Sequence, residues 1–293
     1  MVAFSGHIAT AAALGLFTLA SADPLNIPKM EIAPGIEMPV LSIGTGGLET
    51  SAAKAIVTDW LSLGAKGIDT ALVYKDQQVV GEVIRSMNIS RKELFITTKI
   101  PGCHLAKATV ELDFKLLGMD YVDLMLIHFP QNSSCTEAWS VLEDYHAQGK
   151  IGAIGVSNFK AADLEPILAM AKVKPAVNQI QHNVLRHDDA TIAFCQKHGI
   201  AIEAYSPLGR SNHSGDITGN AVIKAIAASH NVSTYQIALK WIVQHGHLVT
   251  FQSSSQKHQA SDADIFSFNL TDAELQRLDS LQEQPEEEVS IQI

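Results

Sequence analysis

Short apolar runs recur along the chain at intervals of about 30 residues. Residues 66–71, 94–99 and 121–128 are each rich in β-branched or other large apolar side chains and have the length of a buried parallel strand. Five similar runs complete the set, at residues 39–46, 151–158, 175–179, 199–206 and 247–253. The interval fits one strand, one helix and two short loops, so the pattern predicts eight consecutive βα units.

Amphipathic stretches of helical period separate these runs. They cover residues 51–64, 107–117, 136–149, 161–172, 188–198 and 234–244, and glycines stand where several of them end. Eight βα units in about 250 residues are typical of a TIM barrel, whose active residues lie at the carboxyl ends of the strands. We therefore predict an α/β fold of the (β/α)8 class.

The composition fits one compact domain. The chain has 293 residues, of which 46% are hydrophobic and 18% are charged, and no linker rich in proline, glycine or serine divides it. Its formal net charge of −10 argues against a nucleic-acid partner, which would need a basic surface for phosphates. We assign residues 23–284 to the barrel domain and residues 285–293, with the acidic run 286–288, to a solvated acidic tail.

Residues 1–22 have features of a secretory signal peptide. Residues 8–19 are apolar or small, and Ala20, Ser21 and Ala22 form an A-x-A pattern that predicts cleavage after Ala22. The protein is then secretory or extracellular, without membrane contact in its mature form, because about a dozen apolar residues are too few to span a bilayer. The first seven residues contain no lysine or arginine, which leaves a cytoplasmic protein with a frayed amphipathic extension as the alternative.

Five of the ten asparagines stand in N-x-S/T sequons, whereas random placement of serine and threonine would give roughly one or two. They are Asn88, Asn132, Asn212, Asn231 and Asn269. This pattern favours a glycoprotein. The three cysteines, Cys103, Cys135 and Cys195, predict no disulfide framework and leave at least one thiol free, and we expect Cys195 to be a small core residue.

Three predicted strands end on residues that can act on a carbonyl group: Asp69, Lys99 and His128, with Tyr74 beside them. A carbonyl carbon accepts hydride only if its oxygen is stabilised as negative charge develops, so the site needs a proton donor. Singly, these side chains have plain structural interpretations, such as a helix-capping aspartate, a snorkelling lysine, a buried histidine and a packed tyrosine. Together on one rim they predict a site for carbonyl reduction.

Six motifs resemble, in order and spacing, those of the aldo-keto reductase family. They are DTALVY (69–74), ITTK (96–99), LGMDYVDLMLIHFP (117–130), IGVSNF (154–159), PAVNQI (175–180) and AYSPLG (204–209). The resemblance extends from about residue 31 to residue 281. It implies a TIM barrel with an amino-terminal β-hairpin and short rim loops, acting as a monomer on a small carbonyl substrate with NADPH or NADH as cofactor.

The resemblance also implies a role for each rim residue. Tyr74 is then the general acid, and the ammonium of Lys99 favours its phenolate, since an unperturbed phenol has a pKa near 10. Asp69 pairs with Lys99 and keeps it charged and oriented. His128 forms a hydrogen bond at the substrate oxygen.

The chain lacks the Rossmann dinucleotide fingerprint, because Gly44-Thr45-Gly46-Gly47 is followed by Glu49 where the last glycine should stand. By resemblance, the cofactor instead lies across the barrel rim. Ser157, Asn158 and Gln179 then hold the carboxamide and Tyr205 stacks on the nicotinamide, which fixes the orientation that hydride transfer needs. The same resemblance assigns the pyrophosphate to Ser206, Pro207 and Leu208, with Arg210 as an added charge.

The last strand departs from the family pattern. Relatives that prefer NADPH have a lysine in this strand and an arginine after it, and these cations hold the ribose 2'-phosphate. Here residues 250–253 read TFQS, and His258 and Asp262 stand in the later places. Ser253, Ser254 and Ser255 can hydrogen-bond a phosphate or a hydroxyl, while the Asp262 carboxylate would repel a dianion.

We therefore hypothesise weakened preference for NADPH and use of NADH. His258 adds a pH-dependent version of this hypothesis, because an imidazole becomes a cation only in mildly acidic solution. Lys257 is the remaining nearby base that could replace the lost lysine.

Short rim loops predict an open substrate mouth, and we expect Phe129, Trp139 and Cys103 near the substrate, with a core position as the alternative for Trp139. Two other classes of protein remain. The altered phosphate site is the motivation for a nucleotide-binding scaffold without turnover. The four rim residues Asp69, Tyr74, Lys99 and His128 argue against it. A metal hydrolase would have to use His245 and His247, which lack the carboxylate partners that such sites usually have.

Overall fold

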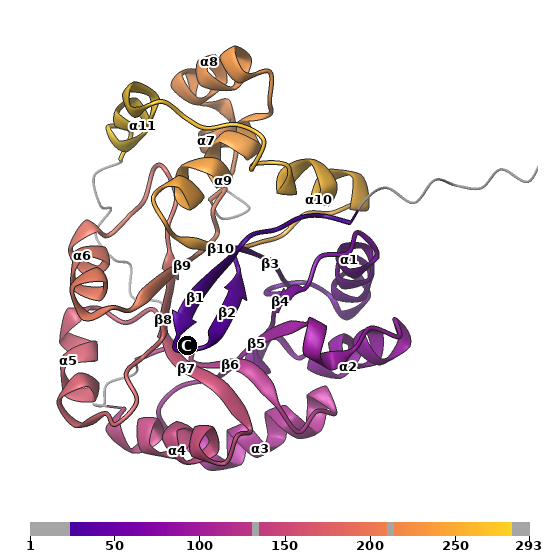
Figure 1. The fold of residues 1–293 in the computed structure, drawn as a ribbon, viewed down its shortest axis with the longest axis vertical. Coiled ribbons are helices and arrows are strands. Elements are labelled where there is room, and N and C mark those ends of the chain that lie inside the picture. Colours follow the sequence, from indigo (N-terminus) through magenta and orange to yellow (C-terminus); the bar gives the residue numbers. More distant parts are fainter. Residues whose placement is uncertain (1–23, 131–134, 210–213, 283–293) are drawn as a thin grey trace, which may run out of the picture.

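The computed structural model describes residues 24–130, 135–209 and 214–282. Eight parallel strands close into a barrel in the order β10-β3-β4-β5-β6-β7-β8-β9, as Figure 1 shows. The strands are β3 (Leu41–Gly44), β4 (Gly67–Asp69), β5 (Phe95–Ile100), β6 (Val122–Ile127), β7 (Ile151–Ser157), β8 (Val177–Gln181), β9 (Ala201–Tyr205) and β10 (Leu248–Phe251). The predicted TIM barrel is confirmed.

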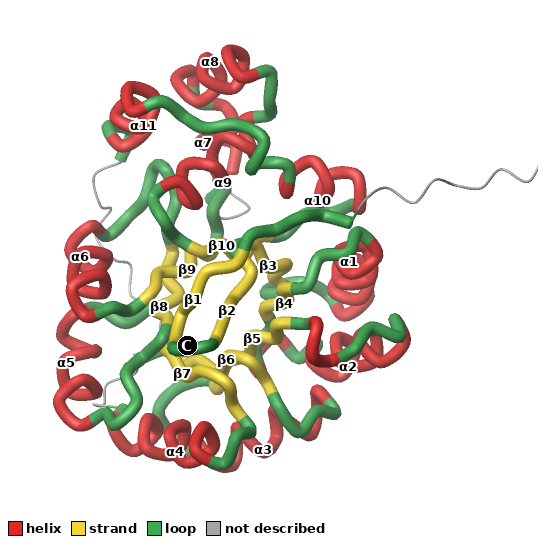
Figure 2. Tube along the Cα trace, viewed as in Figure 1, coloured by secondary structure: helices red, strands yellow, loops and turns green. Residues whose placement is uncertain are grey.

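Helices form an outer ring around the strands (Figure 2). They are α1 (Thr50–Ser62), α2 (Gln77–Ser86), α3 (Ala106–Leu117), α4 (Thr136–Ala147), α5 (Ala161–Met170), α6 (Asp189–His198), α7 (Ser214–Gly219), α8 (Ala221–His230), α9 (Thr234–Gln244), α10 (Gln256–Ala263) and α11 (Asp272–Asp279). None of the helices in the described ranges is both long enough and apolar enough to cross a membrane.

Helix α2 was absent from the predicted stretches, as were α7, α8, α10 and α11. The first turn of α2 begins with two glutamines, which resemble a polar turn. Its apolar stripe is nevertheless present, because Val80, Val83 and Ile84 follow the i, i+3, i+4 spacing and are all buried. Short polar helices such as α10 bury too few apolar side chains to give a clear period.

A two-stranded hairpin closes one end of the barrel. Strands β1 (Lys29–Ala33) and β2 (Ile36–Pro39) pair antiparallel and lie across one end of the barrel in Figure 1. Ile32 and Met38 pack with Phe95, Val177 and Leu248, which lie at the beginnings of their strands. The hairpin therefore covers the amino-terminal end and leaves the carboxyl ends of the strands open, so the expected amino-terminal hairpin is confirmed.

The main core lies between the strands and the helices. Trp139 on α4 is fully buried there, and its indole Nε1 donates to the backbone oxygen of Val173 at 3.1 Å. Trp139 is therefore a core residue, and the expectation that it lies near the substrate was wrong. Its place on the inner face of a helix directs the ring toward the barrel wall instead of the rim.

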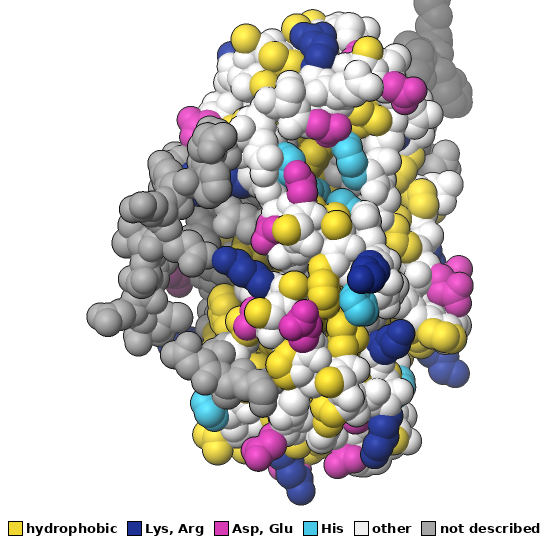
Figure 3. All heavy atoms as spheres, turned by 90° about the vertical axis from the view of Figure 1, so that its left-hand side faces the viewer, with side chains coloured by type: hydrophobic (Ala, Val, Ile, Leu, Met, Phe, Trp, Pro, Cys, Tyr) yellow, Lys and Arg dark blue, Asp and Glu magenta, His cyan; other side chains and the backbone are white. Residues whose placement is uncertain are grey.

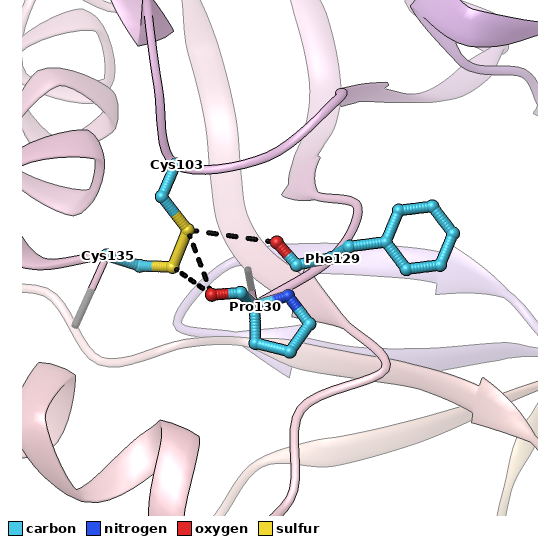
Figure 4. The surroundings of a disulfide bond; sticks show 4 residues. All are labelled: Cys103, Phe129, Pro130 and Cys135. Atoms are coloured by element: carbon cyan, nitrogen blue, oxygen red, sulfur yellow. Dashed lines mark hydrogen bonds between the residues drawn. A yellow bond between two sulfur atoms is a disulfide. The ribbon is translucent and has the colours of Figure 1, made fainter. Parts of the chain in front are cut away.

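Cys103 and Cys135 form a disulfide, with their Cα atoms 4.8 Å apart (Figure 4). It joins the loop after β5 to the residue that begins α4, and Pro130 O lies 3.4 Å from the sulfur of Cys103. The expectation that these cysteines carry no disulfide framework is corrected to one bridge. Adjacent strands bring the two loops together, whereas Cys195 stays free and buried as expected.

Charged side chains of both signs are interspersed with apolar ones on the face shown in Figure 3. Three of the sequon asparagines, Asn88, Asn231 and Asn269, are exposed. The other two, Asn132 and Asn212, lie outside the described residues, as do the signal-like segment 1–22, Arg210 and the acidic tail.

Candidate active site

The open end of the barrel brings together the four residues predicted from the strand ends. Asp69 is the last residue of β4, Lys99 lies near the end of β5, and His128 directly follows β6. Tyr74 ends the 3-10 turn η1 (Leu72–Tyr74) that follows β4. A cavity of about 780 Å³ is lined by Asp69, Tyr74 and His128, and Lys99 lies buried below it.

Lys99 is a buried cation with a fixed carboxylate partner. Its side chain is 0% exposed, and its Nζ donates to Asp69 Oδ1 at 2.6 Å and to Thr70 O at 3.0 Å. Burial alone would lower the pKa of Lys99, but the charge of Asp69, with smaller effects from Tyr74 and Glu203, raises the pKa above its ordinary value. Lys99 is therefore an ammonium at neutral pH.

The Tyr74 phenol lies beside this ammonium, with Lys99 Nζ 5.1 Å from the centre of its ring. Burial raises the pKa of Tyr74, Lys99 lowers it by its charge and by hydrogen bonding, and the charge of Asp69 raises it. Lys99 lowers the pKa of Tyr74, as expected, but the effect of burial is larger. The net pKa of the phenol is therefore raised, and the expectation of an acidic phenol is not met. At neutral pH the phenol keeps its proton.

Close packing of Tyr74 depends on a glycine. A Cβ atom added at Gly46 would lie 2.9 Å from the Tyr74 ring, closer than real Cβ atoms approach. Any larger residue at position 46 would push the phenol from its place beside Lys99. The glycine at position 46 therefore serves side-chain packing, in agreement with the absence of a Rossmann fingerprint in the Gly44–Gly47 segment.

His128 forms the other wall of the cavity. Its ring meets the Tyr74 ring edge-on at 5.6 Å between centroids and stacks on Phe129 at 4.4 Å. Burial, and then the charge of Lys99, lowers the pKa of His128 to about 3. The imidazole is therefore neutral at physiological pH and offers one N–H donor and one acceptor. Its Nδ1 is buried without a protein partner.

A second row of polar residues extends along the rim from His128. Asn158 Nδ2 donates to His128 O and to Ser157 Oγ, both at 3.0 Å, and Tyr205 OH donates to Asn158 Oδ1 at 2.8 Å. Ser157 Oγ in turn donates to Gln179 O at 2.8 Å. Asn158, Gln179 and Tyr205 line the same cavity as Tyr74, together with Ser206 and Leu208.

Gln179 connects the two rows and reveals a residue that the sequence analysis missed. Its Nε2 donates to Asp69 Oδ2 at 2.8 Å and to Glu203 Oε2 at 2.7 Å. Glu203, on β9, is 0% exposed. Burial, and then the charge of Asp69, raises the pKa of Glu203 to about 8. An acidic residue at the centre of an otherwise apolar strand was the signal that could have identified it.

A second cavity, of about 760 Å³, shares Leu48 and Gln252 with the first. Ser253, Ser254, His258 and Asp262 line it, and no lysine or arginine among the described residues does. Burial raises the pKa of Asp262, while a hydrogen bond from Ser253 and the charge of His258 lower it.

Two of the predicted residues lie elsewhere. Ser255 does not line the second cavity, because its hydroxyl caps α10 by accepting from the backbone N–H of His258. Cys103 does not line the first cavity, because the disulfide holds it at a neighbouring pocket with Leu105 and Glu137. Phe129 does line the first cavity, as expected, with 41% of its surface exposed.

The two joined cavities fit an extended dinucleotide. The first presents amide groups and an aromatic ring, and no hydrogen bond to Gln179 Oε1 is found from the part of the chain that the structure describes, which leaves an acceptor for a carboxamide N–H. The second presents hydroxyl groups and a carboxylate, which suit a ribose and a purine. The donor set therefore fits a nicotinamide dinucleotide, either NADPH or NADH.

No group of three or more His, Cys, Asp or Glu side chains within the described ranges is placed to hold a metal ion. His247 Nδ1 instead lies 3.2 Å from Nε2 of His182, whose ring packs against Trp241. Burial, with added repulsion from neighbouring histidines, lowers the pKa of His182 to about 2. These histidines form part of the core between α9 and the strands.

Comparison with known proteins agrees with this geometry. The Aldo/keto reductase family model matches residues 40–283. Glyoxal reductase of Bacillus subtilis is 37% identical over 257 residues, which cover 84% of this chain and 90% of that protein. The 9,11-endoperoxide prostaglandin H2 reductase of Trypanosoma cruzi is 35% identical over 254 residues, which cover 85% of this chain and 89% of that protein.

Solved structures are similar over nearly the whole barrel. An aldo-keto reductase enzyme from a deep-sea metagenome library superposes with a TM-score of 0.83 at 30% identity, covering 89% of this chain and 98% of that one. The Bombyx mori aldo-keto reductase in complex with NADP has a TM-score of 0.81 at 28% identity, covering 87% and 93%. The chain therefore belongs to the aldo/keto reductase family of NAD(P)H-dependent carbonyl oxidoreductases.

Proposed function

We propose that the protein reduces aldehydes or ketones to alcohols, with Tyr74 as the general acid. The observation that carries this proposal is the protonated Tyr74 phenol, held at the cavity between the buried Lys99 ammonium and the neutral His128 ring. Each of these groups has the protonation state that reduction of a carbonyl requires. A bound dihydronicotinamide supplies the hydride.

The rim residues then divide the work of proton transfer. Tyr74 gives its proton to the carbonyl oxygen as negative charge develops there. Lys99 stabilises the phenolate that remains, and Asp69 holds Lys99 in place through the 2.6 Å ion pair. His128, neutral and partly unpartnered, donates a hydrogen bond to the same oxygen and fixes its position.

The second row orients the cofactor. Asn158 and Gln179 would hold the carboxamide. Tyr205, whose hydroxyl is anchored on Asn158, would supply a ring face for the nicotinamide. Ser206 and Leu208 border the same cavity, where the pyrophosphate would lie. Orientation by several fixed contacts brings the hydride near the carbonyl carbon, which accounts for much of the rate of such reactions.

The substrate is an uncharged carbonyl compound. Asp69 is the only charged residue that lines the first cavity among the described residues, and Lys99 already pairs with it. Among its described lining residues, the cavity therefore offers no free cation for a carboxylate or phosphate group of the substrate. Phe129 at the mouth favours a compound with some apolar surface. We propose that the enzyme acts as a monomer.

The test is a comparison of Tyr74→Phe with the wild type. Both are incubated with a reduced nicotinamide dinucleotide and nitrobenzaldehyde, and the loss of nicotinamide absorbance is followed. The substitution keeps the ring beside His128 but removes the proton, so kcat should fall by about 10²–10⁴-fold while nucleotide affinity persists. Tyr145→Phe is the matched control, because its hydroxyl contacts Glu111 on the outer helices.

Full activity of Tyr74→Phe would remove the phenol from the mechanism. A wild type that binds the nucleotide but reduces none of a panel of aldehydes and ketones would favour the alternative, a regulatory or scaffold protein. The second cavity, without a lysine or arginine among its described lining, is the observation that keeps this alternative open.

We further infer a secretory, glycosylated protein. The disulfide Cys103–Cys135 supports this, because such bonds persist mainly in oxidising compartments. The exposed sequons at Asn88, Asn231 and Asn269 support it as well. Protein purified from its native source should lose mass on treatment with an N-glycosidase. An unchanged mass would contradict this inference and leave the reductase proposal intact.

A further inference from the structure

Glu203 is a fully buried acid at the centre of the site with no role in the proton transfer described above. We propose that Glu203 is a positioning residue that, together with Asp69, fixes the Gln179 amide so that its oxygen faces the cofactor. The same carboxyl, when it is neutral, leaves Asp69 as the one carboxylate that competes with Tyr74 for the charge of Lys99 among the described residues. The first part rests on the proposed function, because it takes Gln179 to be a carboxamide ligand.

The orientation of Gln179 follows from its two neighbours. The amide NH₂ group has two hydrogens, and two carboxyl oxygens accept them at 2.8 Å and 2.7 Å. Turning the amide by half a rotation would break both hydrogen bonds and place its oxygen against the Asp69 carboxylate, which repels it. Gln179 therefore presents only Oε1 to the cavity, and both acids are needed to keep it so.

The two carboxyl groups differ in what surrounds them. Asp69 accepts from the Lys99 ammonium as well as from Gln179, so it carries the negative charge. Among the described residues, Glu203 Oε2 accepts from Gln179 alone, and Glu203 Oε1 is buried with no hydrogen-bond partner. An unpartnered buried carboxylate is very unfavourable, so Glu203 is the group that holds a proton.

Other neighbours agree with this assignment. Leu248, which is the strand partner of Glu203 on β10, is apolar and fully buried. The charged groups that act on Glu203 are Asp69 on β4, which opposes ionisation, and Lys99 on β5, which favours it less strongly. The pKa of about 8 expected from this balance places Glu203 in its neutral form at neutral pH.

Ionisation of Glu203 would weaken the acid that the mechanism uses. A second negative charge beside Asp69 binds the Lys99 ammonium more strongly and raises its pKa. Lys99 then stabilises a Tyr74 phenolate less well, and the two carboxylates repel each other across Gln179. Activity should therefore decline as Glu203 loses its proton.

Two substitutions separate positioning from charge. The side chain of Glu203→Gln cannot ionise but keeps an oxygen that can accept a hydrogen bond from Gln179. The side chain of Glu203→Met has a similar size but no oxygen to accept that hydrogen bond. The matched control is Asp113→Asn. Asp113 is another buried acid whose pKa burial raises, to about 7, but it accepts from Thr98 on the helix side of β5 and does not contact Gln179.

Three measurements form the test: NADH affinity by quenching of tryptophan fluorescence, the pH profile of kcat/KM, and the infrared carbonyl stretch of protonated carboxyl groups in the cofactor-free protein. Glu203→Met should bind NADH about tenfold more weakly, as expected for one lost hydrogen bond to a ligand-holding group. Glu203→Gln should bind within about twofold of the wild type and keep its activity to higher pH. Asp113→Asn should change neither property.

The infrared band requires neither cofactor nor substrate. The wild type should show a protonated carboxyl that titrates near pH 8, is missing in Glu203→Gln and persists in Asp113→Asn. If the band is missing from the wild type, or if Glu203→Met binds NADH as tightly as the wild type does, the inference is wrong. Failure of the wild type itself to bind a nicotinamide dinucleotide would instead overturn the proposed function. Should Glu203→Met not fold, the infrared band and the pH profile of Glu203→Gln still decide.

Discussion

The two ends of the barrel rim are built in opposite ways. The reaction end, formed by Asp69, Tyr74, Lys99, His128 and Gln179, is enclosed, and a chain of hydrogen bonds fixes its charged groups. The selection end, formed by Ser253, Ser254, His258 and Asp262, is only half enclosed, because Ser254 and His258 are exposed while Ser253 and Asp262 are buried. Enclosed charges are costly to disturb, whereas exposed ones are cheap to replace. Cofactor preference can therefore change while the chemistry stays the same.

Removing the cation at the reaction end should have the largest effect. Lys99→Met leaves Asp69 buried without its partner, which should lower the free energy of unfolding by about 3–5 kcal/mol and reduce kcat by about 10²-fold or more. Urea unfolding and nitrobenzaldehyde reduction measure the two effects. The control is Lys66→Met, which breaks the exposed pair Lys66–Glu93 and should change stability by less than about 1 kcal/mol. Equal costs for both substitutions would end the contrast between enclosed and exposed charge.

Replacing charges at the selection end should change the choice of cofactor. The wild type should use NADH at least as well as NADPH, because Asp262 faces the second cavity and none of its described lining residues is a lysine or arginine. In the double variant His258→Arg, Asp262→Asn, the ratio of kcat/KM for NADPH to that for NADH should rise about tenfold or more. Parallel titration with both reduced dinucleotides measures this. A wild type with kcat/KM for NADPH far above that for NADH at pH 8 would refute the assignment.

Acid should mimic that substitution in part. The affinity for NADPH should increase as the pH falls, because burial raises the pKa of the Asp262 carboxyl, which therefore loses its negative charge at a higher pH than an exposed aspartate does. The loss of a negative charge favours a phosphate. NADH, which lacks that phosphate, should show little change over the same range. An affinity for NADPH that is independent of pH in the wild type would show that the charge of Asp262 does not control phosphate binding.

The smallest effect belongs to the exposed hydroxyls. Ser254→Ala should weaken the binding of either dinucleotide by no more than about threefold and change the free energy of unfolding by less than about 0.5 kcal/mol. Fluorescence titration and urea unfolding provide the numbers. A large loss of stability would show that Ser254 supports the fold, which its exposure argues against.

The sequence predicted the reaction end well because parallel apolar strands bring their carboxyl ends to one rim. Asp69, Lys99 and His128 follow from that rule alone, and Tyr74 from its motif. The role of Glu203 cannot be predicted from that rule. Glu203 shares Gln179 with Asp69, and Gln179 and Asp69 are 110 residues apart in sequence, so only closure of the barrel brings the three together. The net pKa of Tyr74 also depends on burial, which no spacing reveals.

The departures at the rim have a similar origin. The pairing of Cys103 with Cys135 requires that β5 and β6 be neighbours and that both loops turn toward each other, and three cysteines alone do not specify a pair. Trp139 illustrates the reverse problem. Its distance along the chain from His128 suggested the mouth, but the helical period of α4 turns it inward, where Val173 accepts its N–H.

The β1–β2 hairpin gives the barrel one closed end and one open end, which has a practical consequence. The segment before the hairpin lies on the capped side of the barrel. There Pro24 lies next to Gly64, and Leu25 N donates to Leu63 O at 2.9 Å. A fusion partner, affinity handle or solid support joined ahead of Pro24 would therefore meet the molecule on the side opposite the entrance for reactants. Enzyme tethered in this way should keep its access to solution.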